Sequence, residues 1–485
     1  MNQSASLDGP PAGAMPAWRF GLAAVVVALM PLSFNLGPYL LADKKPLYLS
    51  PLDVLLPLLI LVLLADLAKG RLRDWAPPAA NLCWAVLALA SLGWLSYSTR
   101  AEWARSALLQ TTLVVLFAVW AFRLVVTDAR AGRRLALVLG ASCALCLLYA
   151  LYQYVQPRGE PLPPGETDRY FGGGVTDVRV AGWYPYRAVL AAQIAMLVPA
   201  AAAFAALDSD PVVRVGAWAF AAVGLCVCLS GGGVLAAGAG VLAVAVVLWV
   251  FRREDAPGGA STWGPRRTAA LLVAALLLVA VVVLPRLPRR NPAVLGRTLS
   301  PWIEVEEDGR KQQVPSARLR RFQAAWNLLV SKEALPLPKD RWATGVGAGG
   351  YQSATNQFYA SEYPKPGANI FDEKEFDTKG NEPLTFSLLE TTAVELGLPG
   401  VVLMLCTFLT WIAAAAGAFA RLEPRDASAR ALALAALGAG VGALVYSVFG
   451  SPLVRGPGGS FAFWMGLALA LNAWSRTGRA EAARP

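Results

Sequence analysis

Two arginines in a predicted helix are the first residues whose type and spacing suggest chemistry. Arg318 and Arg321 are three residues apart in an amphipathic stretch predicted as a helix over 318–330, so they share a face. Guanidinium groups bind phosphate in a bidentate manner and stay charged at any relevant pH. The glycine-rich run that follows at 345–351 is able to bring backbone close to a ligand, but it lacks the Lys-Ser/Thr of a P-loop. The two arginines are candidates for phosphate binding; the alternative is a solvated helix face.

Two further arginines flank a predicted membrane span at 185–207. Arg179 lies in the outer segment 157–184, and Arg187 lies at the entrance to the span. An arginine at this depth is costly unless it is paired or given an anion. Both are therefore candidates for binding an anionic group. The alternative is an interfacial anchor beside the aromatic residues of 183–186.

Glu390 and Glu395 are the candidate proton acceptors. They lie about one and a half helical turns apart, near the outer end of a predicted span at 396–420. Burial there would raise the pKa of a carboxylate towards the range in which it works as a general base. Helix capping and contact with arginines of the preceding loop are the structural alternative for both glutamates.

The residue types that the chain lacks restrict this chemistry further. There is no histidine among 485 residues, which removes the commonest general base near neutral pH and the commonest metal ligand. The six cysteines all fall in apolar runs, a pattern typical of small buried side chains rather than disulfides or metal ligands. We therefore expect no metal and no cofactor.

The elements that must position these residues are membrane helices. The chain is 56% hydrophobic and only 15% charged, and its mean hydropathy is +0.48, outside the range of ordinary soluble proteins. Apolar stretches long enough to cross a bilayer predict an all-α polytopic membrane protein with about twelve transmembrane helices. We place them near residues 18–36, 48–68, 78–98, 105–125, 135–156, 185–207, 211–230, 232–251, 268–285, 396–420, 430–450 and 460–475.

Lysines and arginines gather in alternate short loops, which predicts that both termini are cytoplasmic. The same bias explains the net charge of +11; no basic run or aromatic-interleaved groove suggests nucleic-acid binding. The predicted organisation is a cytoplasmic segment 1–17, helices one to nine over 18–285 with an outer loop near 157–184, a large periplasmic loop 286–386, helices ten to twelve over 387–475, and a cytoplasmic tail 476–485.

Four sequence blocks resemble a known family when they are taken in chain order. They are RVAG at 179–182, LSGGGV at 229–234, SAR at 316–318 followed by Phe322 and a helix leading to GVG at 345–347, and 388–400 with ELG at 395–397. With about twelve spans and one large outer loop, they resemble the O-antigen ligase/polymerase superfamily of bacterial envelope glycosyltransferases over roughly 135–475.

The resemblance implies a GT-C-like, multi-pass protein of the bacterial inner membrane. Such enzymes transfer glycan from an undecaprenyl diphosphate donor to a glycan or glycolipid acceptor at the periplasmic face, without nucleotide sugar or metal. The resemblance thus implies a part in lipopolysaccharide or other polysaccharide biosynthesis, with membrane lipids and chain-length or assembly proteins as partners. The family's donor-binding arginines carry over onto Arg179 and Arg318, and Arg321 and Arg187 join them as candidates for the donor diphosphate.

Two departures from the family pattern decide between its activities. Ligases of the family have a histidine just before the ELG block, where this chain has Phe386, and the family's common Ser-Arg pair is Ser230-Gly231 here. The missing histidine favours a polymerase that joins lipid-linked repeat units, with Glu390 or Glu395 as the base or with departure of the diphosphate driving the reaction. The alternative is a ligase that attaches polymer to lipid A core or another acceptor.

Two readings from outside this chemistry stay open. A transporter or flippase for a lipid-linked anion would have internal repeats, and no convincing duplication is present in the sequence. The second open interpretation is a catalytically inactive scaffold for envelope assembly.

Overall fold

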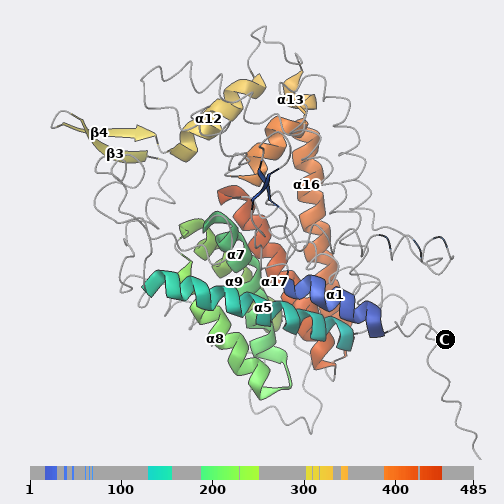
Figure 1. Ribbon diagram of the computed structural model, residues 1–485. Coiled ribbons are helices and arrows are strands. Elements are labelled where there is room, and N and C mark those ends of the chain that lie inside the picture. Colours follow the sequence, from blue (N-terminus) through green and yellow to red (C-terminus); the bar gives the residue numbers. More distant parts are fainter. Residues whose placement is uncertain are drawn as a thin grey trace, which may run out of the picture.

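The computed structural model describes a subset of the chain, and within that subset the backbone is almost entirely helical (Figure 1). The described residues are 17–29, 38–40, 46–48, 61, 65, 68, 129–155, 187–228, 230–250, 302–307, 310–315, 317–330, 340–347, 387–423 and 426–450. Among them are five helices long and apolar enough to cross a membrane, namely Arg130–Val155, Val189–Leu207, Gly231–Val250, Leu388–Arg421 and Ala427–Phe449. The prediction of a helical membrane protein is confirmed.

Seven of the described helices match predicted spans, because two shorter apolar helices, α1 and α8, add to these five. They are α1 (Ala17–Leu29), α5 (Ala129–Val155), α7 (Arg187–Leu207), α8 (Pro211–Val227), α9 (Gly231–Val250), α16 (Leu388–Arg421) and α17 (Ala427–Phe449). The predicted spans at 78–98, 105–125, 268–285 and 460–475, and almost all of 48–68, lie outside the described residues. The total of about twelve spans therefore stays a prediction.

Short polar residues begin several of these helices. Asp210 caps α8 by accepting a 2.9 Å hydrogen bond from the backbone N–H of Val212, with Pro211 at the first helical position. Asp426 caps α17 by accepting a 3.0 Å hydrogen bond from the backbone N–H of Ala429. Capping residues of this kind sharply limit the ends of apolar runs, which is why the sequence located these helices well.

Small residues let the central helices α7, α9 and α17 pack closely. A Cβ on Gly442 of α17 would collide with the backbone carbonyl of Ala195 on α7, and one on Gly240 of α9 would collide with Pro199 and with the carbonyl of Gly438. Lipid tails are as apolar as leucine, so helices in a membrane associate through such close van der Waals contact rather than through hydrophobic burial.

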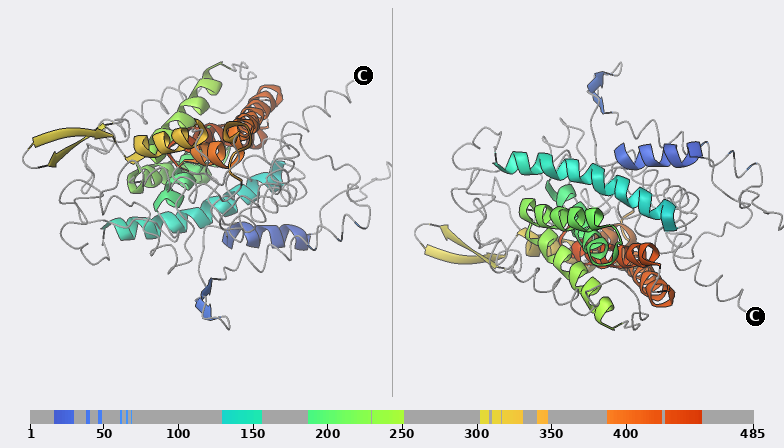
Figure 2. Two further views of the ribbon diagram at one scale, coloured as in Figure 1. Left: turned by 90° about the horizontal axis from the view of Figure 1, so that it is seen from above. Right: turned by 90° about the horizontal axis from the view of Figure 1, so that it is seen from below.

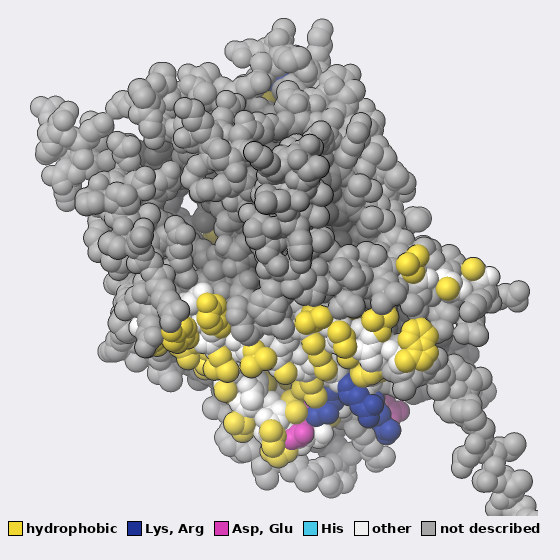
Figure 3. Space-filling view, in the orientation of Figure 1, with side chains coloured by type: hydrophobic (Ala, Val, Ile, Leu, Met, Phe, Trp, Pro, Cys, Tyr) yellow, Lys and Arg dark blue, Asp and Glu magenta, His cyan; other side chains and the backbone are white. Residues whose placement is uncertain are grey.

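Helices α1 and α5 lie side by side and cross the front of this central group, as Figure 1 and both views of Figure 2 show. Ser142 of α5 donates a hydrogen bond to the backbone carbonyl of Ala28 on α1. The surface over this region carries hydrophobic side chains (Figure 3). Exposed apolar residues of the described helices include Leu145 and Leu148 of α5, and Val212 and Val215 of α8. Exposed apolar side chains on helices of this composition are suited to contact with lipid.

Two antiparallel strand pairs add to the helices, and the all-α prediction did not include them. The pairs are β1 (Pro38–Leu40) with β2 (Pro46–Tyr48), and β3 (Trp302–Glu307) with β4 (Arg310–Pro315). The sequence does carry a signal for the second pair, because Asp308-Gly309 separates the strands and this dipeptide is typical of tight hairpin turns.

Candidate functional site

Helix α16 breaks near its start and folds back on itself. Gly397 has a φ of 66° and a ψ of −170°, and Pro399 follows two residues later. Thr392 Oγ1 lies 3.6 Å from Met404 Sδ, whereas twelve residues of straight helix would separate these positions by about 18 Å. Residues 388–396, here named the short arm, therefore lie against the long remainder of α16.

The beginning of the short arm is held by the end of α17. The Ser387 hydroxyl donates a 2.9 Å hydrogen bond to the backbone carbonyl of Ser447, and the Leu388 N–H donates a 3.0 Å bond to the carbonyl of Gly450. Ser387 also caps α16, accepting a 3.3 Å bond from the N–H of Glu390. The sequence predicted neither contact between these chain-distant segments.

The other end of the short arm binds the glycine turn of the large loop. Val346 N–H donates a 2.8 Å hydrogen bond to the carbonyl of Val394, and Gly347 N–H donates a 3.0 Å bond to the carbonyl of Glu395. The GVG block at 345–347 and the ELG block at 395–397 are thus in direct contact. The described part of the glycine run, 345–347, approaches the protein's own backbone, and its ability to approach a ligand stays a prediction.

Both sides of this contact require glycine. Gly345 and Gly397 have φ values of 69° and 66°, in the left-handed region. A Cβ on Gly397 would lie 2.8 Å from the carbonyl carbon of Ala343, and one on Gly345 would collide with the carbonyl of Glu395. The two backbones approach each other too closely for any side chain at either position.

Helix α12 (Ala317–Val330) packs on the same assembly and confirms the helix predicted over 318–330. Ala325 and Leu328 of α12 form a small buried cluster with Val346 and Val394. Arg341, in the short helix α13 (Arg341–Thr344), is 1% exposed and donates a 3.3 Å hydrogen bond from Nη1 to the carbonyl of Leu328. The short arm, α12 and α13 therefore form one packed unit at the top of Figure 1.

The two candidate glutamates both lie on the short arm, and each is 8% exposed. Glu390 is the third residue after the cap Ser387, the position of the acidic residue in a capping box. Glu395 lies at the opposite end, where its carbonyl receives the Gly347 N–H. Buried hydroxyls of Ser387, Thr391, Thr392 and Ser447 surround this region. The alternative of helix capping thus gains support at Glu390, whereas Glu395 lies at the end of the short arm that binds the loop.

The structure places the predicted arginines to different degrees. Arg318 and Arg321 are in the first turns of α12, and Arg187 is the first residue of α7, but their side chains lie outside the described set. Arg179 and Phe386 lie outside the described residues altogether. The contacts of the four donor-binding candidates stay predictions.

The start of α7 lies at the same end of the bundle as the short arm. A Cβ on Gly233 would lie 3.0 Å from that of Ala191, and a Cβ on Gly232 would lie 2.5 Å from that of Phe449 at the end of α17. The beginnings of α7, α9 and α16 and the end of α17 therefore meet there. Arg187 and the unit that carries Glu395 are located at one end of the molecule.

Two buried polar residues at this end escaped the sequence analysis. Gln193 is 4% exposed within α7, and Arg341 is almost fully buried between α12 and the short arm. Gln193 had a usable signal, since a lone polar residue within an apolar span is a functional candidate by default. Arg341 had a weaker one, its place directly before the glycine turn.

An ion pair joins helices at the opposite end of α7. Arg133 of α5 binds Asp208 through two hydrogen bonds, Nε to Oδ2 at 2.8 Å and Nη2 to Oδ1 at 2.9 Å. Burial acts to raise the pKa of Asp208, but the hydrogen bonds from Arg133 and from the Asp210 N–H outweigh it and hold that pKa below its ordinary value. This pair is remote from the short arm and ties α5 to the α7–α8 turn.

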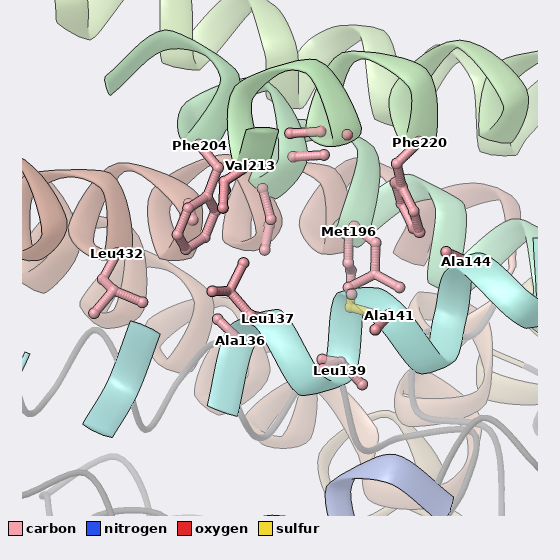
Figure 4. A pocket seen from close by; sticks show the side chains of 18 of the residues that line it. Ala136, Leu137, Leu139, Ala141, Ala144, Met196, Phe204, Val213, Phe220 and Leu432 are labelled. Atoms are coloured by element: carbon pink, nitrogen blue, oxygen red, sulfur yellow. The ribbon is translucent and has the colours of Figure 1, made fainter. Parts of the chain in front are cut away.

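An apolar cavity of about 310 Å³ lies between α5, α7, α8 and α17 (Figure 4). Met196, Phe204, Phe220 and Leu432 line it together with further leucines, a valine, alanines and glycines. It contains no charged or hydroxyl side chain, so it suits hydrocarbon and offers no group for acid–base chemistry. Among the described residues, no cluster of three or more His, Cys, Asp or Glu side chains could hold a metal ion.

No protein-family model matches this chain, and no curated protein matches it.

Proposed function

We propose that this protein is an integral-membrane glycosyltransferase of the O-antigen ligase/polymerase type. In this proposal it joins glycan units at the periplasmic face, drawing on an undecaprenyl-diphosphate-linked donor. The observation that carries the proposal is the docking of the GVG turn on the ELG turn, with Gly347 N–H bonded to the Glu395 carbonyl at 3.0 Å. Two of the blocks on which the resemblance rests, distant in the chain, belong to one packed unit.

The proposed roles combine the family resemblance with the positions of Arg318, Arg321 and Glu395 on this unit. In the reaction, the bond between the anomeric carbon and the diphosphate oxygen breaks, and the acceptor hydroxyl oxygen forms the new bond. Arg179 and Arg318, supported by Arg187 and Arg321, would stabilise the negative charge that develops on the departing diphosphate. A buried carboxylate would take the acceptor's proton. We assign this to Glu395, because Glu390 occupies the capping position behind Ser387.

Replacing the arginines tests the donor site. We expect Arg179→Ala and Arg318→Ala to abolish long-chain surface polysaccharide while the protein still accumulates in the membrane, because neutral alanine cannot stabilise a leaving diphosphate. Arg320→Ala is the matched control on the same helix. Gel profiles of the polysaccharide and an immunoblot of membranes measure both quantities. Wild-type chain lengths from both variants would remove the donor-site assignment.

Replacing the glutamates tests the base separately. Glu395→Gln keeps the size and hydrogen-bonding capacity of the side chain but removes its basicity, so transfer should slow by about 10²–10⁴-fold, the usual contribution of a general base. Glu390→Gln should have the smaller effect. Turnover of a purified lipid-linked donor is the measurement. If both variants turn over at the wild-type rate, departure of the diphosphate drives the reaction without either carboxylate.

A deletion strain separates the activities within this class. A polymerase deletion leaves single repeat units on the lipid core, whereas a ligase deletion leaves polymer on undecaprenyl diphosphate. The absence of histidine from the chain favours the first outcome. Accumulation of unpolymerised donor on the cytoplasmic side alone would point to transport across the membrane and would contradict both.

A further inference from the structure

A row of two aromatic residues and one valine on α12, here named the aromatic row, is exposed, although the opposite face of the helix is buried. Phe322, Trp326 and Val330 follow one another at intervals of four residues, so they form one stripe along the helix. Their exposed fractions are 51%, 58% and 51%. Ala325 and Leu328, on the other side, pack towards the short arm of α16. Trp342 of α13 is exposed to a similar extent, 57%.

This surface continues into an exposed apolar row on α16. Leu398, Val402, Leu405 and Leu409 recur with helical spacing on the long part of α16, and all four are exposed. The Trp342 carbonyl lies 2.9 Å from the point where a Cβ on Gly397 would stand, which places α13 directly beside Leu398. The Arg341 bond to the Leu328 carbonyl joins α13 in turn to the last turns of α12.

The chemistry of the row on α16 identifies what covers the row on α12. The long part of α16 belongs to a helix with the length and composition of a membrane span, so its exposed leucines and valine suit lipid tails. Tryptophan and other large aromatic residues are enriched where such a surface meets the headgroups. Arg318 lies one turn before Phe322 in the same row, and a basic residue beside aromatic ones is typical of helices that lie in the membrane interface.

We infer that α12 and α13 rest on the phospholipid surface at the folded-back end of α16, with Phe322, Trp326 and Trp342 inserted at the level of the headgroups. The occupant of the exposed aromatic surface is the bilayer itself. The large loop is then held to the membrane at two places, through the glycine turn on the short arm and through this surface. The inference does not depend on the proposed glycosyltransferase activity.

If the proposed function is also correct, the inference fixes the depth of the donor site in the membrane. The same unit carries Glu395 and the first turns with Arg318 and Arg321, so these residues lie at the depth of the headgroup phosphates. The diphosphate of a lipid-linked donor lies at that depth without leaving the membrane.

Site-directed spin labelling of the full chain in lipid nanodiscs tests the inference. The six native cysteines are first replaced, and labels are then attached at Trp326→Cys and Trp342→Cys. Leu405→Cys is the control in the lipid-facing row, and Asp340→Cys, at an exposed polar residue next to α13, is the control in water. We expect the ratio of oxygen accessibility to accessibility for a water-soluble nickel complex at both tryptophan positions to lie between the ratios at Leu405 and at Asp340, as at the level of the headgroups. Nickel accessibility equal to that at Asp340, or inaccessibility to both reagents, would overturn the inference; the second outcome would mean that protein or glycan covers the row.

A second measurement uses the unmodified chain and so does not depend on how the variants fold. Nanodiscs are prepared with a phospholipid that carries a photoactivated diazirine near its headgroup, and the irradiated protein is digested with trypsin. Cleavage after Arg321 and Lys332 releases the peptide 322–332, which contains the whole aromatic row. Lipid adducts on this peptide are expected, and their absence, with adducts present elsewhere on the protein, would contradict the inference.

Discussion

At the scale of single residues, the shifted pKa of Asp208 predicts how the stability of the protein depends on pH. Its side chain is fully buried, with 0% exposure, and the Arg133 side chain that binds it is 23% exposed. The pKa of Asp208 is lower in the folded protein than its ordinary value. The stability that this carboxylate contributes is therefore present above its unfolded pKa and is lost as the pH falls through its folded pKa.

We predict that Asp208→Asn lowers the free energy of unfolding at neutral pH by about 2–3 kcal/mol, because hydrogen bonds to charged groups contribute about 1.5–3 kcal/mol. The variant should also lose part of the wild-type decline in stability on acidification. Thermal unfolding midpoints in detergent between neutral and acidic pH measure both effects. Asp210→Asn is the control, since Asp210 lies 3.9 Å from Arg133 Nη2 and is 45% exposed. Equal effects from the two variants would contradict the prediction.

The glycines at the loop contact allow a second test at this scale. Gly397→Ala and Gly345→Ala should each destabilise the protein by about 2 kcal/mol, because each alanine would hold a positive φ and would push the two backbones apart. Gly216 of α8 has no atom within 4 Å of a built Cβ, so Gly216→Ala should be neutral or stabilising by about 0.5–1 kcal/mol. The same unfolding measurement separates these outcomes.

At the scale of elements, the fold-back of α16 is the feature to verify. With cysteines introduced at Thr392 and Met404, a short bifunctional thiol reagent should join them in a cysteine-free background, since the native side chains approach to 3.6 Å. Cysteines at Met404 and Ala416 have the same sequence separation within the long part of α16, where helical rise places them about 18 Å apart. Mass spectrometry of the digested protein detects the link. A link in the second pair, or none in the first, would exclude the hairpin.

The sequence predicted the helices better than their contacts. The predicted spans at 185–207 and 430–450 match α7 and α17 closely, because Asp208 follows the apolar run of α7 and Asp426 precedes that of α17. The helix over 318–330 was predicted from its amphipathic spacing. Helical spacing was expected for Glu390 and Glu395, but the fold-back of the short arm at Gly397 was not predicted.

The candidate site was predictable only in part. Glu390 and Glu395 were chosen for their position beside a span, and both are buried. The contact between the short arm that carries them and the glycine turn was not predicted. Hydrogen bonds between distant backbone segments, such as that from Val346 to Val394, produce no periodic pattern in a single sequence. Arg341 was missed for the same reason, because its burial depends on α12 and the short arm lying together.

At the scale of the whole molecule, the turn at 208–210 and the loop unit lie at opposite ends of the helices. An alternating path through the bilayer puts the beginning of α5 and the α7–α8 turn on one side, and the Arg133–Asp208 pair joins these two segments. The positive-inside pattern predicts that this side is cytoplasmic. Asp340, before α13, should then face the periplasm.

Thiol labelling tests this orientation. In a cysteine-free background, a membrane-impermeant maleimide added to spheroplasts should modify Asp340→Cys at once. Ser209→Cys, at an exposed residue of the α7–α8 turn, should react only after the membrane is permeabilised. The reverse pattern would invert the predicted topology, and labelling of both positions from outside would require an even number of spans between them instead of the predicted three.

The break in α16 has a consequence for how the chain satisfies the hydrogen bonds of its buried backbone. In a continuous helix the carbonyls of Val394 and Glu395 would accept hydrogen bonds from residues 398 and 399, but residue 399 is proline and has no N–H. Val346 and Gly347 donate to these two carbonyls instead. Val394 and Glu395 are both buried, and a buried carbonyl left without a donor costs about 1–3 kcal/mol. The large loop therefore supplies donors that the membrane helix lacks, and the two cannot separate without leaving those carbonyls unsatisfied.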